Sequence, residues 1–179
     1  KSYTKSDRIF RVIKISEEDA TTRNWAPTST PLGPELASYM PEIESYFRVY
    51  PIGSLSISIN DSIKSVVKFT ELNGFFADPS MIDILDLEFV QGDRETALNE
   101  LQVIVISESM AERFFPKGDA LGKMVHIDNY DEAYMITGIM KDLTENSHLE
   151  LNFLIPMERF RQFLINAGRE GLYNSRTWA

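Results

Sequence analysis

Cysteine is absent from this 179-residue chain, which excludes disulfides, thiol nucleophiles and zinc–thiolate sites. Long apolar runs are also missing, and no stretch approaches the roughly 20 residues that a membrane-spanning helix needs. Basic residues are outnumbered, with 18 Lys and Arg against 27 Asp and Glu and a formal net charge of −9. Because nucleic-acid binding needs a basic surface, the composition argues against it.

Histidine is scarce, with only His126 and His148 in the chain. Their spacing matches neither of the short patterns, HxH or HxxxH, that bring two imidazoles to one zinc ion. His126 falls in a predicted strand and His148 in a polar loop, so we expect neither to bind metal or act in catalysis. No GxSxG nucleophile elbow is present either.

Carboxylates are abundant, and some of them fall close together by chance. Asp83 and Asp86 share one predicted helical turn, and residues 128–132 loosely resemble a calcium loop. The loop lacks the central glycine and the ordered ligand positions of an EF-hand. We interpret these acids as a solvated surface. The alternative, a hydrolase with an acid pair, requires two buried carboxylates that face one cleft.

A glycine-rich segment, GDALGK at residues 118–123, is close to a phosphate-binding loop. A Walker A loop needs four residues between its glycines and Ser or Thr after the lysine. Here three residues separate Gly118 from Gly122, and Met124 follows Lys123. The sequence therefore predicts a turn with no phosphate site.

Periodicity predicts a mixture of helices and strands. The hydrophobic content is 43%, which is typical of a folded chain with one or two small domains. Alternating or β-branched runs predict strands, including a hairpin around Asn60–Asp61, at 7–15, 43–51, 55–72, 103–106, 124–127 and 133–140. Helical spacing predicts helices at 31–40, after Pro79, through 110–115 and at 156–167. The predicted fold class is α+β, with small mixed sheets and strand–helix–strand units.

Helix starts carry recognisable capping signals. Thr30 and Asp78 each precede a proline, which predicts that they cap the helices that follow. Ser107 or Ser109 can cap the next helix, and Ser109 has capping-box spacing with Glu112.

Three aromatic residues stand out because they lie outside the regular patterns. Trp25 falls in a polar loop, and Phe75 and Phe76 precede a helix. Large aromatic side chains are frequent hot spots of protein interfaces, so all three are candidate contacts for a partner protein. The alternative is that they cover the hydrophobic core.

Five segments together resemble one known family. They are DRIFRV at 7–12, PLGPELASYMPEIESYFRV at 31–49, FFADPSMIDILDLEFVQGD at 75–93, ALNELQVIVISESMAERFFPKGDALGK at 97–123 and ITGIMKDLTENSHLELNFLIPM at 136–157. In this order they resemble the MacB-like periplasmic core domain, the extracytoplasmic lobe of FtsX/MacB-type ABC transporter permeases. Among these permeases, the chain is most similar to the Bacteroidetes type.

The resemblance implies a fold with two subdomains. Residues 1–51 would form half of a porter-like subdomain, and residues 52–179 would form a sabre-like one. Members of the family usually continue past a tryptophan like Trp178 into a strand–helix–strand that completes the porter-like part. The domain would have no catalysis and no cofactor of its own.

The resemblance also implies a function and partners. The parent chain would sit in the bacterial inner membrane, with this domain on the periplasmic face. The domain would couple cytoplasmic ATP hydrolysis to substrate export or to a periplasmic partner. Implied partners are a second permease subunit, an ATP-binding subunit reached through the membrane part, and an envelope adaptor or lipoprotein. The alternative function is an extracytoplasmic ligand-binding sensor domain, which needs a pocket with convergent polar groups.

Overall fold

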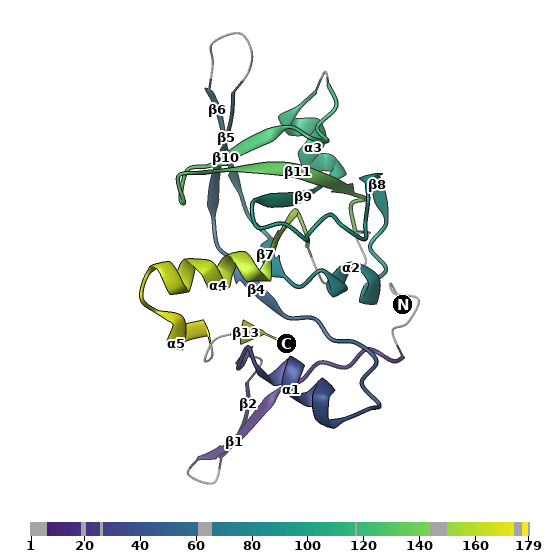
Figure 1. The fold of residues 1–179 in the computed structure, drawn as a ribbon, viewed down its shortest axis with the longest axis vertical. Coiled ribbons are helices and arrows are strands. Elements are labelled where there is room, and N and C mark those ends of the chain that lie inside the picture. The colour runs from purple at the N-terminus through teal and green to yellow at the C-terminus, as the bar shows by residue number, and fades with distance from the viewer. Residues whose placement is uncertain are drawn as a thin grey trace.

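The chain folds into an α+β domain in which helices flank one large mixed sheet, as the sequence predicts (Figure 1). The computed structural model describes residues 7–18, 21–25, 27–60, 66–116, 118–143, 150–173 and 177–178. Within these ranges no helix has both the length and the apolar character that a membrane crossing requires.

The main sheet has eleven strands in the described part of the chain, and a separate hairpin lies beside it. In spatial order the sheet runs β3 (Pro27–Thr28), β13 (Thr177–Trp178), β4 (Val49–Ile52), β7 (Gly74–Ala77), β12 (Phe153–Pro156), β9 (Val103–Ser107), β11 (Glu132–Met140), β10 (Met124–Ile127), β5 (Leu55–Asn60) and β6 (Val66–Glu71). Strand β8 (Phe89–Gly92) pairs with one end of β11. The separate hairpin consists of β1 (Lys14–Glu18) and β2 (Thr21–Trp25).

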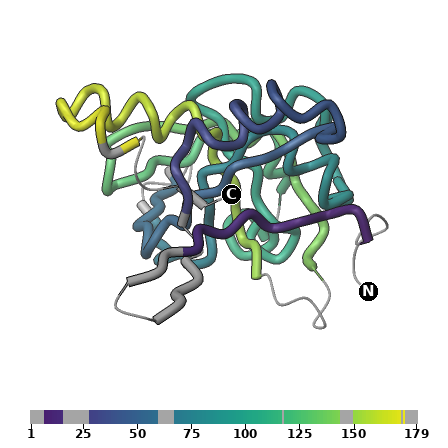
Figure 2. Tube along the Cα trace, turned by 90° about the horizontal axis from the view of Figure 1, so that it is seen from below, coloured from purple at the N-terminus to yellow at the C-terminus, as the bar shows by residue number. Residues whose placement is uncertain are grey.

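Five helices complete the described structure. They are α1 (Leu32–Tyr39), α2 (Ser80–Ile84), α3 (Glu108–Phe114), α4 (Met157–Asn166) and α5 (Glu170–Tyr173). Helix α4 ends before Gly168, which has a φ of +63° that glycine adopts without strain. Figure 2, viewed from below, shows the N-terminal segment crossing the same end of the molecule as α1.

The capping predictions are only partly confirmed. The Ser107 hydroxyl accepts a hydrogen bond from the Met110 amide at 3.2 Å and so caps α3. Ser109 does not form a capping box with Glu112, because its amide and hydroxyl both donate to Asp142.

Thr30 and Asp78 do not cap helices, and that prediction is wrong. Helices α1 and α2 begin at Leu32 and Ser80, so Pro31 and Pro79 occupy the N-cap positions and no side chain caps either helix. The Thr30 hydroxyl donates to the Tyr173 carbonyl instead, and the Asp78 carboxylate binds Arg48. Both side chains make tertiary contacts that a local sequence pattern does not encode.

The strand predictions hold where pairing is local. The hairpin β5–β6 forms as predicted, although residues 61–65 at its tip lie outside the described residues. The predicted strands 7–15 and 43–51 form ladders only in β1 and β4, and their remaining residues belong to no ladder. The expected subdomain boundary between residues 51 and 52 falls inside β4.

Two central strands were not predicted. Strands β7 and β12 pair in parallel, and β12 also pairs antiparallel with β9. All four residues of β12 are buried, so its FLIP sequence shows no alternation. Such a run cannot be distinguished from the start of a helix by periodicity alone.

The sheet is buried on both faces at β9, as its β-branched sequence predicts. Ile104 and Ile106 belong to a core cluster that also takes side chains from α3 and α4, including Phe114 and Met157. Val105 points to a second cluster that takes side chains from α2. The two clusters form one layered core that fixes the positions of all the surface features described below.

A half-buried ion pair joins the α1 end of the molecule to the sheet. The Arg48 guanidinium donates to both carboxylate oxygens of Asp78, at 2.8 Å each. The Arg48 amide also donates to the Asp78 carboxylate, and the Asp78 amide donates to the Arg48 carbonyl. The remaining terminal nitrogen of Arg48 reaches the Thr30 carbonyl at 3.4 Å. Burial acts to lower the pKa of Arg48, but the Asp78 carboxylate outweighs it and holds that pKa above its ordinary value.

Gly74 is required by the close approach of β7 to β12. A Cβ at this position would lie 1.9 Å from the ring of Phe153, its fully buried partner in the ladder. We expect Gly74→Ala to lower the free energy of unfolding by about 1–3 kcal/mol through overpacking. Urea denaturation measures this change. The matched control is Gly53→Ala, where a Cβ would meet nothing within 4 Å. Equal effects at both glycines would contradict the steric explanation.

Removal of the Asp78 charge tests the Arg48 ion pair. We expect Asp78→Asn to lower the free energy of unfolding by about 3 kcal/mol, because the half-buried guanidinium of Arg48 loses its counter-charge. The control is Glu88→Gln, which breaks an exposed ion pair with Lys141 and should cost less than about 1 kcal/mol. Similar losses in both variants, measured by urea denaturation, would show that the Arg48 pair has no special weight.

Candidate functional site

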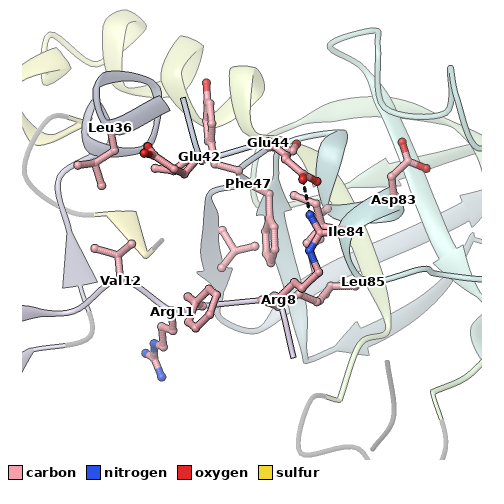
Figure 3. A pocket seen from close by; sticks show the side chains of 18 of the residues that line it. Arg8, Arg11, Val12, Leu36, Glu42, Glu44, Phe47, Asp83, Ile84 and Leu85 are labelled. Carbon is pink, nitrogen blue, oxygen red and sulfur yellow. Dashed lines mark hydrogen bonds and ion pairs between the residues drawn. The ribbon is translucent and has the colours of Figure 1, made fainter. Parts of the chain in front are cut away.

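An apolar groove lies at the α1 end of the molecule, lined by residues of the described part of the chain (Figure 3). Its volume is about 820 Å³. The N-terminal segment 7–12 forms one wall, and residues 42–49 form the other. Helix α1 contributes Gly33 and Leu36 at one end, and α2 with the residue after it contributes Asp83, Ile84 and Leu85 at the other.

Apolar side chains dominate the groove. Phe47 and Phe75 lie against the second core cluster, and Phe10 is 84% exposed at the opposite wall. An aromatic ring with this exposure, next to other apolar side chains, is typical of a surface that contacts another polypeptide.

The charges at the groove are few and mostly paired. Arg8 and Glu44 form an ion pair from opposite walls, drawn as a dashed line in Figure 3. Asp83 pairs with Arg94 at 3.1 Å, and Asp86 lies 3.8 Å from the same guanidinium. The two acids therefore take part in surface ion pairs with Arg94 and do not form a catalytic dyad. A groove of this composition suits an apolar segment better than a polar small molecule, which would need convergent donors and acceptors.

The three aromatic candidates for partner contact are divided by the structure. Phe75 lines the groove and is half-buried. Phe76 is 3% exposed and packs against Phe160 and Phe163 of α4, so it lies in the core and is not available to a partner. The side chain of Trp25 lies outside the described part of the structure.

His126 takes part in a polar network together with Asp128 and Asp131, which belong to the segment 128–132 that loosely resembles a calcium loop. Its two ring nitrogens lie 3.3 Å from Asp128 and from Asp131. Asp128 also accepts hydrogen bonds from Lys68 and Ser58, at 2.8 Å each. These donors, led by Lys68, hold the pKa of Asp128 well below its usual range.

This network has no metal-binding geometry. The two carboxylates contact opposite nitrogens of His126, so they cannot meet at one ion. Among the described residues, no group of three His, Asp or Glu side chains could hold a metal. His148 lies outside these residues.

The GDALGK segment forms a turn, as its spacing predicts. Gly122 has a φ of +76°, and its amide donates to the Ile136 carbonyl at 2.7 Å. The Lys123 ammonium lies 4.7 Å from the centre of the Phe115 ring in a cation–π contact. Lys123, the residue at the place of a phosphate-loop lysine, therefore packs against the Phe115 ring.

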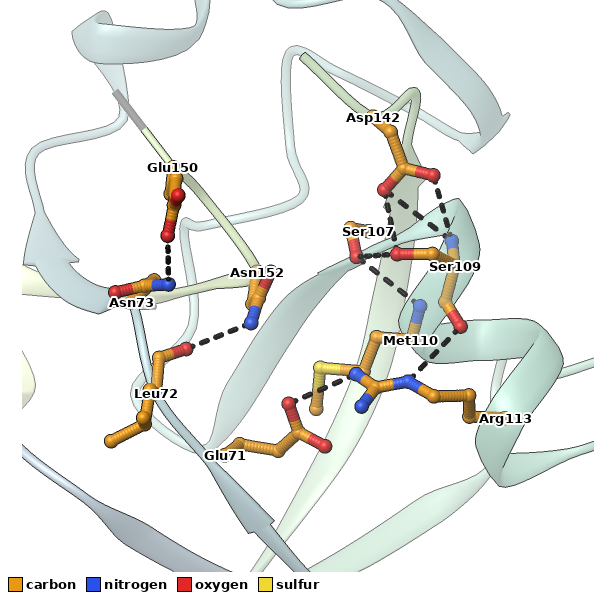
Figure 4. A network of polar contacts seen from close by, with 10 residues as sticks. All are labelled: Glu71, Leu72, Asn73, Ser107, Ser109, Met110, Arg113, Asp142, Glu150 and Asn152. Atoms are coloured by element: carbon orange, nitrogen blue, oxygen red, sulfur yellow. Dashed lines mark hydrogen bonds and ion pairs between the residues drawn. The ribbon is translucent and has the colours of Figure 1, made fainter. Parts of the chain in front are cut away.

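A polar cluster surrounds the start of α3 and the end of β6 (Figure 4). The Asp142 carboxylate accepts hydrogen bonds from the Ser109 amide and hydroxyl. The Glu71 carboxylate accepts a hydrogen bond from Arg113 at 3.0 Å. Glu71 is 1% exposed, and its other carboxylate oxygen has no hydrogen-bond partner among the described residues. The cluster ties β6 and the segment after β11 to α3.

A second buried cluster holds α4 on the sheet. Arg159 of α4 donates to the Tyr134 hydroxyl at 3.2 Å and pairs with Glu132. Burial raises the pKa of Tyr134 to about 12. The guanidinium also stacks on Phe163, 4.2 Å from the ring centre. These partners explain the buried charge as a structural anchor for the helix.

Local sequence patterns do not predict the groove, although the segments that form its walls carry a recognisable pattern. Segments 7–15 and 43–51 each carry apolar residues on both faces, with Phe10 and Val12 opposite Ile9 in the first. That pattern suits a strand covered on both sides, and it was the available signal. The groove itself depends on the distance between two segments more than thirty residues apart, which local patterns do not encode.

Comparison with solved structures shows the same fold in three bacterial transporter domains. A domain of a predicted permease from Porphyromonas gingivalis shares 24% identity over 77% of this chain and 56% of that chain, with a TM-score of 0.64. The periplasmic region of MacB from Actinobacillus actinomycetemcomitans shares 20% identity over 86% of this chain and 67% of that one, with a TM-score of 0.55.

A third similar structure is the extracellular domain of the ABC-type transporter YknZ from Gram-positive bacteria. It shares 15% identity over 76% of this chain and 66% of that one, with a TM-score of 0.50. At these identities the likeness shows the fold alone. This chain thus covers between about half and two thirds of the length of each of these three solved chains.

The family assignment comes from a comparison with protein-family models. No curated protein matches the chain. The family model described as the MacB-like periplasmic core domain matches residues 1–174, nearly the whole sequence. The chain therefore belongs to the family of MacB-like periplasmic core domains.

Proposed function

We propose that this domain is a non-enzymatic, extracytoplasmic lobe of an ABC transporter permease, and that it couples ATP hydrolysis in the cytoplasm to a periplasmic partner or to export. The family match over residues 1–174 carries the proposal. We place the domain on the periplasmic face of the bacterial inner membrane, where the similar region of MacB is found.

The internal construction of the domain supports a mechanical role. One eleven-stranded sheet runs from β3 and β13 at the α1 end to the hairpin β5–β6 at the far end. Helices α3 and α4 are held on this sheet by core packing and by partnered charges. A packed sheet transmits displacement with little internal loss, because close-packed interiors are stiff. Motion imposed at the α1 end would therefore reach the β5–β6 end as rigid-body movement.

The proposed partners follow from the same role. A second permease subunit and an ATP-binding subunit, contacted through the membrane part, would supply the movement. An envelope adaptor or a lipoprotein would receive it. The bonds of Asp128, Asp142 and Arg159 each join separate elements of the fold, which supports a structural role for these three side chains.

Deletion of the domain from the permease tests the coupling. We expect a permease that lacks residues 1–179 to retain ATP binding at its ATP-binding subunit and to lose transport. ATP binding is measured by nucleotide affinity, and transport by efflux or by release of the partner. The control is the Glu88→Gln permease, which changes an exposed charge and should transport normally. Normal transport by the deletion would contradict the proposed coupling.

A sensor domain is the second candidate function, and the presence of a pocket of about 820 Å³ is the observation that favours it. A metabolite held at 100 times its dissociation constant would add about 2.7 kcal/mol of stability and raise the melting temperature by about 5–10 °C. Under the coupling proposal we expect no polar metabolite to shift the melting temperature of the domain. A thermal-shift screen distinguishes the two functions, and a reproducible shift that Phe47→Ala abolishes would establish the sensor.

A further inference from the structure

Strand β6 is the last strand at the far end of the main sheet (Figure 1). Among the described strands it pairs only with β5, so its other edge has no ladder partner there. The edge of a sheet carries N–H and C=O groups that another strand can bind. The outer edge of β6 is therefore a place where the sheet can be extended.

The ladder identifies which residues of β6 have free main-chain groups. The Ser56 carbonyl accepts the amide that follows β10 at 2.9 Å, so Ser56 points its main-chain groups away from β6. Because these groups alternate in direction along a strand, Ile57 points its own to β6, where its partner is Phe69. On β6 the neighbours of Phe69 therefore point outward. No described residue outside β5 bonds to the main chain of Lys68 or Thr70.

The features that usually protect a sheet edge are missing from residues 66–71. The strand has no proline, no glycine and no register shift against β5. Its one lysine, Lys68, reaches across β5 to the Asp128 carboxylate at 2.8 Å, so its charge lies over the sheet and not beyond the edge. The free edge ends at Leu72, whose carbonyl accepts a hydrogen bond from the Asn152 side chain at 3.0 Å. Residues 66–70 are left for a further strand.

The side chains of β6 also suit a strand that has a neighbour on each side. The Phe69 ring stacks on Phe114 of α3, with 4.2 Å between the ring centres. Val67 lies on the same face and is 38% exposed, although its ladder partner Ile59 is 6% exposed. An apolar side chain of a further strand, placed beside Val67, would continue the core across this edge.

A second copy of β6 fits the edge in an antiparallel, two-fold register. When Lys68 lies opposite Lys68 of the copy, residue 66 lies opposite Thr70, so residues with free main-chain groups meet and each such pair exchanges two bonds. The same register sets Val67 beside Phe69 of the copy on the apolar face. Each Lys68 keeps its own Asp128, which compensates the like charges at the axis.

The register displaced by two residues toward Leu72 is unsuitable. It would need the Leu72 carbonyl, which Asn152 already binds, and it would set Val67 against Glu71 of the copy. Glu71 is 1% exposed, and one of its carboxylate oxygens has no partner among the described residues. An apolar neighbour would leave that oxygen unsatisfied.

We propose that the outer edge of β6 pairs with the same edge of a second copy of this domain, which joins two eleven-stranded sheets across a two-fold axis. The pairing rests on the proposed function, since the second permease subunit supplies the second copy. Each domain has a net charge of −9, which opposes association in free solution. Two subunits held together in one membrane have a high effective concentration, which offsets this repulsion.

Disulfide trapping in the full permease tests the register. This chain has no cysteine, so the experiment uses a permease that is cysteine-free throughout. Val66→Cys and Thr70→Cys are introduced together, and the membranes are oxidised mildly. Residues that exchange main-chain bonds in an antiparallel pair lie about 5.5 Å apart between Cα atoms, which suits a disulfide. We expect a band of twice the chain mass that disappears on reduction.

The matched controls are the two single variants. In the proposed register, a single cysteine and its counterpart in the copy lie four residues apart along the ladder, at least about 13 Å, and cannot form a disulfide. We expect at least about tenfold less crosslink from Val66→Cys alone and from Thr70→Cys alone.

Hydrogen exchange in the permease without cysteines provides a second measurement. The Lys68 and Thr70 amides should exchange at least about tenfold more slowly than in the Val67→Lys permease, because an inward-pointing lysine prevents edge pairing. The Phe69 amide, which faces β5, should stay equally protected in both proteins and so reports that the hairpin β5–β6 is intact.

Other results overturn the proposal. Equal crosslinking by a single variant would show chance collision and not the proposed register. Protected Lys68 and Thr70 amides without a crosslink would show that a different polypeptide occupies the edge, and unprotected amides would show that nothing pairs there. A specific crosslink in a permease whose deletion variant still transports would support the pairing and contradict only the coupling function.

Discussion

The arrangement of the domain depends on the ion pair between Arg48 and Asp78. Four hydrogen bonds join the two residues, and both side chains are mostly shielded from water. Arg48 lies immediately before β4, and Asp78 lies between β7 and α2. The pair therefore fixes the direction in which the chain leaves the sheet, and with it the position of one wall of the groove. Its third contact, at the Thr30 carbonyl, brings in the segment that precedes α1.

Local patterns were sufficient for elements whose stability is local. The hairpin β5–β6, the unit of β9 and α3, and helix α4 all form where the sequence predicts them. The α+β class follows from these elements. In each case the strand or helix pattern is complete within a short window, and a nearby residue ends the element, as Gly168 does after α4.

Elements defined by distant partners could not be predicted in this way. Strand β12 is buried by β7 and β9, which lie more than forty residues away, and its four apolar residues carry no period. Thr30 and Asp78 resemble helix caps, but tertiary partners take their side chains. The sequence could not separate the two phenylalanines of the candidate site for the same reason. Phe75 and Phe76 are adjacent in sequence, yet strand alternation sends one to the groove and the other to the core.

The described polar groups favour the groove, over any charged cluster, as the part of this domain that another polypeptide would contact. Asp128, Arg159 and Asp142 each make two or more hydrogen bonds within the fold, so binding of a ligand there would first have to break those contacts. The groove offers the opposite situation. Exposed apolar surface at Phe10 and unpaired backbone at Phe47 both gain stability when another chain covers them. Binding of another chain at this place would therefore be favoured by the same forces that fold the domain.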